Sequence, residues 1–484
     1  MSIPLFVVAG YLVVVTLVGS LVARRGGNAR EWTVAGGSLG TLMLTVGLAG
    51  TRIGGAGTYG VAGDVITGGI WYLWWYGAAT FLALAFVGIF FARAYRRLRL
   101  QTIGELFWIR YGSRRTQVLT SLCVQTLYLA VNIIEPYVIG AILVSLTGMS
   151  MALGVAIGAA VLITYTALGG LRGAALTNLI HSVVIIVGLV VVAALGVDHL
   201  GGWAALNAAV DLQLADAGVE PAAWWSLTGG GWVAIIGMIF AAAIHTPAAS
   251  IYANFSTAAR SPRVLVPGFV LGGLVAGLMP ICAGFIGMQA LARYGVASGP
   301  RGYASVTAIA LEISPWLGGL ALAAVLAAVV SSGGPVLLSS ATMFVRDWLP
   351  ASRAWTQERK LRAYRITTVV YGIGAALLAW VAADRGISLL QLLLLGYAMV
   401  VPPAISVAFT LYWQRTTEAG AFWGMALGYG AGVVWYFLFH ASTGIDPSHP
   451  TTIVPIIAVP LISLLTRPDP VPDAYRRALA REEQ

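Results

Sequence analysis

The chain has 484 residues, of which 59% are hydrophobic and only 10% are charged, and its mean hydropathy is +0.86. This composition excludes a soluble globular domain and is typical of a polytopic α-helical membrane protein. The formal net charge of +10 does not require a nucleic-acid partner, because the cytoplasmic loops of membrane proteins collect arginine and lysine. The two cysteines lie in apolar segments and predict neither a disulfide framework nor a metal site.

A membrane-spanning helix needs about 20 predominantly apolar residues, and the sequence predicts thirteen such helices. In chain order they are expected at 3–23, 39–61, 69–91, 117–146, 152–168, 175–195, 232–254, 264–291, 315–344, 367–383, 388–412, 421–439 and 453–465. No basic residue precedes the first apolar run, so the first helix is expected to be retained rather than cleaved.

The distribution of arginine predicts the orientation of the chain. With the N-terminus outside, most arginines near helix ends fall inside, including Arg24 and Arg25, and only Arg293, Arg301 and Arg385 fall outside. This asymmetry is what the positive-inside rule requires. We therefore expect a multi-pass protein of a prokaryotic-type plasma membrane, with its N-terminus outside and its C-terminus in the cytoplasm.

The second predicted helix is interrupted near its middle. Four glycines fall within the eight residues 50–57, and glycine is unfavourable in a helix interior. Arg52 lies in the same stretch, where a charge at membrane depth costs about 2.5–3.5 kcal/mol. Unwound backbone is tolerated at this depth only where protein or a water-filled cavity surrounds it. The stretch therefore favours a binding site, and the alternative is a glycine-faced packing helix with Arg52 reaching to one membrane surface.

The seventh predicted helix is also interrupted, by His245-Thr246-Pro247. The two interrupted helices are five helices apart, and a repeat of five helices is necessarily inverted in the membrane. Paired interruptions of this kind indicate the binding site of a secondary transporter. We therefore expect one transporter domain, 1–484, in five parts: a first helix and loop (1–37), two inverted repeats (38–198 and 229–413), two extra helices (414–466) and a cytoplasmic tail (467–484).

Five motifs, in order along nearly the whole chain, resemble those of the sodium:solute symporter family, which includes sodium–sugar, proline, pantothenate and choline transporters. They are residues 31–40, residues 53–63, residues 102–106 with 110–112, residues 165–172 with Thr177-Asn178, and Ser331-Ser332 with residues beyond. The resemblance implies the leucine-transporter fold, in agreement with the predicted inverted repeat.

The resemblance also implies a sodium site between the interrupted second helix and the ninth helix. Its ligands would be the backbone carbonyls of Gly50, Ile53 and Ala328 and the hydroxyls of Ser331 and Ser332. Unwound carbonyls and hydroxyls supply the neutral oxygens that suit sodium at membrane depth. The alternative for the two serines is a hydrogen bond back to the preceding turn of their own helix. Sodium would be the coupling ion, and no other cofactor is expected.

Arg52 departs from the family pattern, because it falls beside the implied sodium ligands. Either it faces the substrate cavity and binds a carboxylate of the solute, which we favour, or it pairs with Glu135 and transport is sodium-independent. The alternative for Glu135 is a cap on a Pro136 kink, and for His245 a satisfied core residue. The residues expected to bind substrate are Arg52, Gly54, Gly55, Gly57, Asn132, Glu135, His245, Thr246 and Ser250.

The sequence therefore predicts an all-α transporter that carries out sodium-coupled symport of a small organic solute into the cell. The expected partners are the solute, the sodium ion and the lipid bilayer, without nucleic acid. The alternatives are a proton-coupled or sodium-independent transporter, or a solute sensor, although the segment after Arg467 is short for a sensor's output domain. An enzyme is not expected, because no zinc-protease helix, nucleophile elbow or phosphate loop is present in the sequence.

Overall fold

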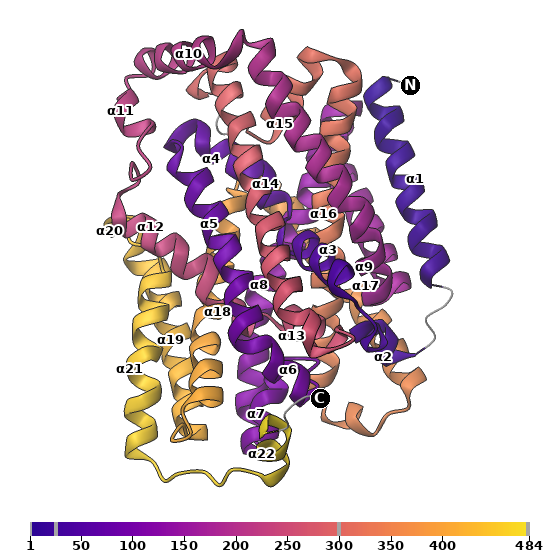
Figure 1. Cartoon of the computed structure of the whole chain (residues 1–484), viewed down its shortest axis with the longest axis vertical. Helices are drawn as coiled ribbons and strands as arrows, with labels where there is room; N and C mark the ends of the chain where they lie inside the picture. Colours follow the sequence, from indigo (N-terminus) through magenta and orange to yellow (C-terminus); the bar gives the residue numbers. More distant parts are fainter. Residues whose placement is uncertain (1, 24–27, 298–301, 481–484) are drawn as a thin grey trace.

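The computed structural model of the chain describes residues 2–23, 28–297 and 302–480. Within these ranges the protein is built from helices, with no β-strand and one isolated bridge between Leu39 and Ala259 (Figure 1). Eleven helices of this part are long and apolar enough to cross a membrane. The two predicted spans that are not among these eleven are the first helix and the interrupted second helix, so the count of thirteen stays a prediction.

The long helices follow one another with short connections. They are α1 (Ile3–Ala23), α5 (Trp71–Phe86) continued by η3 (Val87–Phe91) and α6 (Ala92–Leu98), α8 (Arg114–Thr147), α9 (Met151–His199), α14 (Leu265–Tyr294), α16 (Pro315–Met343), α17 (Gln357–Asp384), α18 (Leu389–Tyr412), α19 (Glu418–Leu438) and α21 (Ser448–Leu465). Shorter connecting helices are α2 (Ala29–Val34), η1 (Ala35–Gly37), α7 (Gly104–Tyr111), η6 (Pro262–Val264), η8 (Phe344–Trp348), η9 (Pro350–Ala354), α20 (His440–Thr443) and α22 (Asp473–Ala480).

Both predicted interruptions are present. The first lies between α3 (Thr41–Arg52) and the π-helical turn η2 (Ala56–Gly60), which leads into α4 (Val61–Gly68). The second follows α12 (Gly231–Ile239) and the π-helical turn η4 (Phe240–Ile244), and contains η5 (Thr246–Ala248) before α13 (Ser250–Ala258). Ile53 in the first break (φ −100°, ψ 115°) and Ala249 in the second (φ −69°, ψ 107°) have the extended backbone that ends a helix.

The fifth and sixth predicted helices are the two halves of α9, which meet at a sharp kink where Gly170 has a non-helical backbone (φ 58°, ψ −170°). A Cβ at this position would lie 2.8 Å from Cδ1 and 3.0 Å from Cα of Trp32, on α2. Glycine is needed here for two reasons. The backbone has a positive φ, which other residues rarely adopt, and any side chain would clash with Trp32. The glycine pair therefore separates the two predicted helices, which form two of the eleven candidate spans, Met151–Leu171 and Gly173–His199.

The region between 199 and 231, expected to be a loop, contains α10 (Gly202–Asp216) and α11 (Pro221–Trp224) at the upper end in Figure 1. Another short helix, α15 (Gly302–Ile313), was also not predicted. These helices are too short to cross a membrane. They were not predicted because they lack the long apolar run by which a membrane-spanning helix is identified. Trp224 fastens this region to the end of α4, since its indole N–H donates to the Val65 carbonyl at 3.0 Å and its own carbonyl accepts from the Ile70 amide at 3.0 Å.

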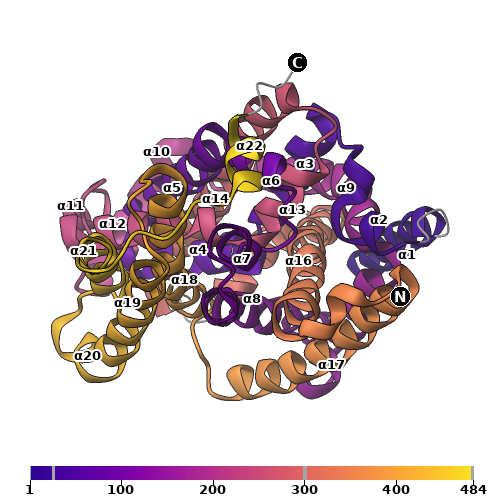
Figure 2. The same cartoon turned by 90° about the horizontal axis from the view of Figure 1, so that it is seen from below.

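The centre of the molecule is formed by α16, which packs against α8, α9 and α3. In its most apolar stretch 94% of the residues are buried, whereas the corresponding value for α17 and α19 is 28%. Seen from below, α1 lies at one edge, α19, α20 and α21 lie at the opposite edge, and α8 and α16 lie between them (Figure 2). The peripheral helices expose large apolar side chains such as Phe437 and Leu465, as lipid-facing helices do.

The described chain begins at one end of the molecule and finishes at the other. Helix α1 starts at the upper end, and α22 packs on α6 at the lower end (Figure 1). This arrangement agrees with the predicted odd number of crossings, and both that number and the end that faces the cytoplasm stay predictions. Arg24, Arg25 and Arg301, which contributed to the predicted orientation, lie outside the described residues.

Candidate functional site

The first break meets α16 through the two serines of that helix. The Ser331 hydroxyl lies 2.9 Å from both the Gly50 and the Ala328 carbonyl oxygens, and the Ser332 hydroxyl lies 3.0 Å from the Ala328 oxygen. Gly50 permits this approach because it has no side chain. A Cβ there would lie only 3.2 Å from Ser331 Cβ, which is too close for comfortable packing. The Gly50 carbonyl belongs to the last turn of α3, where carbonyls have no partner within the helix.

Four of the five implied sodium ligands therefore lie together, and Ile53 is the first residue beyond α3. All of them are buried, and the oxygens that converge here are neutral carbonyls and hydroxyls. This donor set fits a monovalent hard cation. Both hydroxyls also lie within hydrogen-bond distance of a carbonyl of the preceding turn, as the alternative of back-bonding serines requires.

Glu135 of α8 lies against the same place. One carboxylate oxygen, Oε2, accepts from the Gly55 amide at 3.0 Å, and the other, Oε1, accepts from the Ser332 hydroxyl at 2.6 Å. Glu135 thus connects the first break to α16. Among the ion pairs of the described residues none joins it to Arg52, so the pairing considered from the sequence is not formed.

Arg52, the last residue of α3, points instead toward the second break. Its Nη2 donates to the Ala242 carbonyl at 2.5 Å, and its Nη1 lies 3.4 Å from His245 Nε2. The guanidinium carbon stands 4.9 Å from the ring centre of Tyr397, on α18. Nε of Arg52 is buried and has no hydrogen-bond partner. A guanidinium with a free donor and no carboxylate is an anion-binding group.

His245 serves as a supporting residue for Arg52. Its ring stacks on Tyr397, with ring centres 4.0 Å apart and planes 13° from parallel. Its Nδ1 lies 2.5 Å from the Ala241 carbonyl, to which it donates, and this leaves Nε2 to accept from Arg52. Both ring nitrogens are therefore satisfied, which agrees with a neutral core histidine.

Arg52 opens onto a cavity between the two breaks, α8 and α18. The lining carries three tyrosines and no carboxylate, and comprises Thr51, Arg52, Leu127, Tyr128, Val131, His245, Ala249, Ile251, Tyr252, Val336 and Tyr397. Its electrostatic character is therefore positive, and its walls are aromatic and apolar. The tyrosines were not among the residues expected to bind substrate, although Tyr128 lies seven residues before Glu135, on the same side of a helix.

The remaining residues expected to bind substrate lie outside this lining. Gly54 and Gly55 face Glu135, and Gly57 faces Tyr76. The amide nitrogen of Asn132 donates to the Tyr128 carbonyl at 2.6 Å, and Ser250 accepts from the Ile103 amide at 3.0 Å. Thr246 is buried with an unpaired hydroxyl. These residues lie on elements next to the cavity, but the rotation of each helix decides which side chains reach it.

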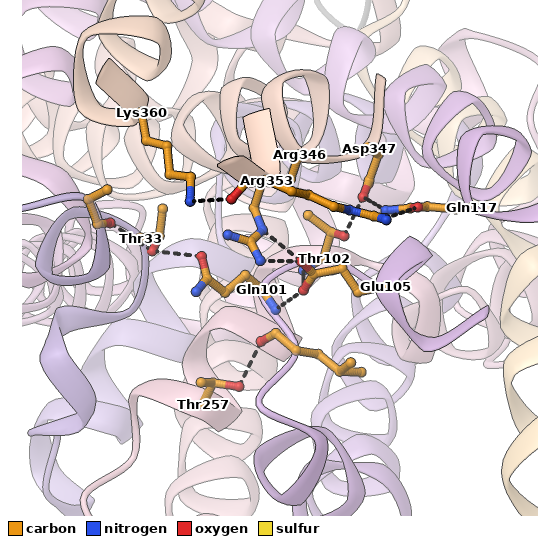
Figure 3. Close-up of polar contacts among 12 residues, drawn as sticks. Thr33, Gln101, Thr102, Glu105, Gln117, Thr257, Arg346, Asp347, Arg353 and Lys360 are labelled. Carbon is orange, nitrogen blue, oxygen red and sulfur yellow. Dashed lines mark hydrogen bonds and ion pairs between the residues drawn. The ribbon is translucent and has the colours of Figure 1, made fainter. Parts of the chain in front are cut away.

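A polar network closes the structure below the cavity (Figure 3). Glu105 of α7 forms an ion pair with Arg346 of η8. Asp347 accepts from the Thr102 hydroxyl at 2.8 Å and from the Gln117 amide at 2.7 Å, and Arg353 donates to Gln117 at 2.9 Å. These bonds hold the segment before α7 and the start of α8 against the end of the α16 helix.

Comparison with known proteins agrees with this arrangement. The model of the sodium:solute symporter family matches residues 32–428. The osmoregulated proline transporter OpuE of Bacillus subtilis (strain 168) is 24% identical, over 98% of this chain and 97% of its own. Sodium/glucose cotransporter 1 of Oryctolagus cuniculus is also 24% identical, over 93% of this chain and 75% of its own.

Solved structures show the same fold. A sodium-coupled sialic acid symporter in a substrate-bound outward-open state superimposes with a TM-score of 0.80 at 20% identity, covering 98% of this chain and 99% of its own. Mhp1, a nucleobase-cation-symport-1 family transporter in a closed conformation, gives a TM-score of 0.59 at 16% identity, covering 92% and 97%. The fold is thus of the leucine-transporter type. With the family match over most of its length, the chain belongs to the sodium:solute symporter family and is a sodium-coupled solute symporter.

Proposed function

We propose that this symporter carries a small solute bearing a carboxylate into the cell, and that Arg52 binds the carboxylate. The observation that carries the proposal is the buried guanidinium of Arg52, which faces the cavity without a carboxylate partner. A buried charge without a counter-charge is costly, and the solute would supply that counter-charge. A guanidinium can hold a carboxylate through two parallel hydrogen bonds, which also fixes its orientation.

The tyrosines suit the remainder of such a solute. Tyr128, Tyr252 and Tyr397 line the cavity from α8, α13 and α18 and offer flat apolar faces with hydroxyl groups at their edges. The Tyr128 hydroxyl already accepts from the Ile251 amide at 2.7 Å, so its position is fixed. We assign the sodium ion to the oxygens of Gly50, Ile53, Ala328, Ser331 and Ser332. The ion and solute then lie on opposite sides of the same break.

Uptake into proteoliposomes tests the proposal. Radiolabelled L-proline, L-lactate and pyruvate serve as carboxylate probes and D-glucose as the neutral one, each with an inward sodium gradient and with choline in place of sodium. We expect sodium-dependent uptake of at least one carboxylate and none of glucose. Arg52→Gln should raise the half-saturating concentration of that carboxylate about tenfold or more and preserve the dependence on sodium.

Two results would contradict the proposal in different ways. Sodium-dependent uptake of glucose alone would reject the carboxylate and the role of Arg52. Uptake of any probe that ignores sodium in the wild-type protein would reject the sodium ligands named here.

A further inference from the structure

Glu135 occupies an unusual position for a carboxylate in a membrane protein. It is 2% exposed, and in the described part of the chain no lysine or arginine forms an ion pair with it. Its two bonds come from neutral donors, the Gly55 amide and the Ser332 hydroxyl. Two neutral hydrogen bonds do not replace a counter-ion at this depth, so the bare carboxylate is destabilising.

Glycines on two sides make the space for this carboxylate. A Cβ on Gly54 would lie 2.1 Å from Oε1 of Glu135, and a Cβ on Gly55 would lie 3.2 Å from Oε2. On the side of α16, a Cβ on Gly333 would lie 3.3 Å from Cγ of Glu135. The break and α16 are therefore shaped around the carboxylate, which a side chain at Gly54 would displace.

The hydrogen bond from Ser332 has a direct effect on the ion site. A hydroxyl has one proton, and at 2.6 Å the Glu135 carboxylate is a nearer acceptor for it than the Ala328 carbonyl at 3.0 Å or the Val329 carbonyl at 3.1 Å. Donation to Glu135 leaves the lone pairs of Ser332 free for a cation. It also places a negative charge beside that hydroxyl.

We propose that Glu135 is the anionic member of the sodium site, contributing its carboxylate beside Ser332 to the cation held between α3 and α16. This inference rests on the proposed sodium ligands. It also accounts for Arg52, whose positive charge lies two residues from Gly50 and repels a cation nearby. Glu135 offsets that repulsion. The site thus holds one carboxylate for the sodium ion and one guanidinium for the solute.

Sodium binding to the purified protein, measured without solute, tests this inference. The readouts are equilibrium binding of ²²Na⁺ and the melting temperature in detergent as sodium chloride replaces choline chloride at constant ionic strength. We expect Glu135→Gln to raise the half-saturating sodium concentration at least about tenfold. Ser332→Ala should weaken binding similarly. Glu312→Gln is the matched control and should leave binding unchanged, because Glu312, on α15, bonds instead to Arg293 and Tyr294, both on α14.

The melting temperature without sodium separates an ionic role from a purely structural one. If the carboxylate is unpaired until a cation binds, Glu135→Gln is at least as stable as wild type in choline chloride. The variant then loses most of the increase in melting temperature that sodium produces in the wild type. A lower melting temperature in choline chloride with an intact sodium response would show that Glu135 only anchors the break, and would overturn the inference. If Ser331→Ala and Ser332→Ala also leave the sodium response unchanged, the proposed ion site itself is wrong.

Discussion

At the scale of single residues, the two buried charges of the transport site are separated rather than paired. Arg52 extends from the end of α3 toward Ala242 and Tyr397, whereas Glu135 reaches the other side of the break, at Gly55 and Ser332. Each charge lacks an oppositely charged neighbour within the described residues. Two separated, unpaired charges suit the proposed symport of a carboxylate with sodium.

Gly54 tests how tightly the ion site is packed. Gly54→Ala places a methyl group 2.1 Å from Glu135 Oε1, so the carboxylate or the break must move. We expect sodium-dependent uptake to fall by at least about tenfold while the protein still reaches the membrane. Gly374→Ala on α17 is the control, because no atom lies within 4 Å of its new methyl group. Normal sodium dependence in Gly54→Ala would mean that the ion site lies elsewhere.

Residue-scale features were only partly predictable. The sequence identified Arg52, Glu135, Ser331 and Ser332 because charged and hydroxyl groups are conspicuous in apolar helices. It did not say whether Arg52 faces the ion or the cavity, since this depends on where α3 ends and how the helix is rotated. The tyrosines of the lining were missed because aromatic residues in apolar helices are common and carry no signal of their own.

At the scale of elements, glycine and proline residues predicted both breaks. The breaks lie where these residues occur, because glycine destabilises a helix interior and proline removes a backbone hydrogen bond. The helices that do not cross the molecule, α10, α11 and α15, had no such signal. Gly170 belongs with the breaks, because its neighbours suggested a connection between two helices and the backbone is non-helical there. The outcome depends on Trp32, which is distant in sequence and against which the bend is packed.

The bend in α9 provides a stability test with an internal control. Gly170→Ala places a Cβ 2.8 Å from Trp32 and forces a left-handed backbone on alanine, so we expect destabilisation by about 1–3 kcal/mol. Gly173→Ala, one turn away in the same helix, meets no atom within 4 Å and should be neutral or slightly stabilising. Melting temperatures in detergent give the comparison, and equal values for the two variants would contradict it.

At the scale of the whole molecule, a polar network lies below the cavity, among buried apolar side chains such as Ile103 and Phe107. The network of Glu105, Arg346, Asp347 and Gln117 fastens the connector before α7 to the end of α16 (Figure 3). Such bonds can be exchanged for bonds to water at little net cost. They therefore suit a contact that opens and closes in each transport cycle.

Glu105→Gln should weaken this closure by removing the ion pair with Arg346. We expect faster thiol labelling of a cysteine introduced at Ser256, which is fully buried in this structure, in a background with Cys123 and Cys282 replaced by alanine. Glu418→Gln removes a different ion pair, with Arg115, and should leave the labelling rate unchanged. An unchanged rate in Glu105→Gln would show that the network does not hold the lower end closed.

The orientation of the chain is the remaining prediction at this scale. Cysteines placed at Ser2 and at Glu483, a residue outside the described range, should be labelled from opposite sides of the membrane, Ser2 from outside. Labelling from one side would contradict the odd number of crossings, and the reverse order would contradict the arginine distribution.

The π-helical turns beside the two breaks give the transporter unequal halves. An inverted repeat relates the first break to the second by reversing direction, so equivalent turns would lie toward opposite ends of the molecule. Here η2 follows its break and η4 precedes the other, so both lie on the side of α4 and α12, toward the upper end in Figure 1. A π-helical turn holds an extra residue and is a natural point of bending. The helices beside both breaks therefore have a point of bending on the side of α4 and α12, and the lower network has one of its own in η8, which is also π-helical.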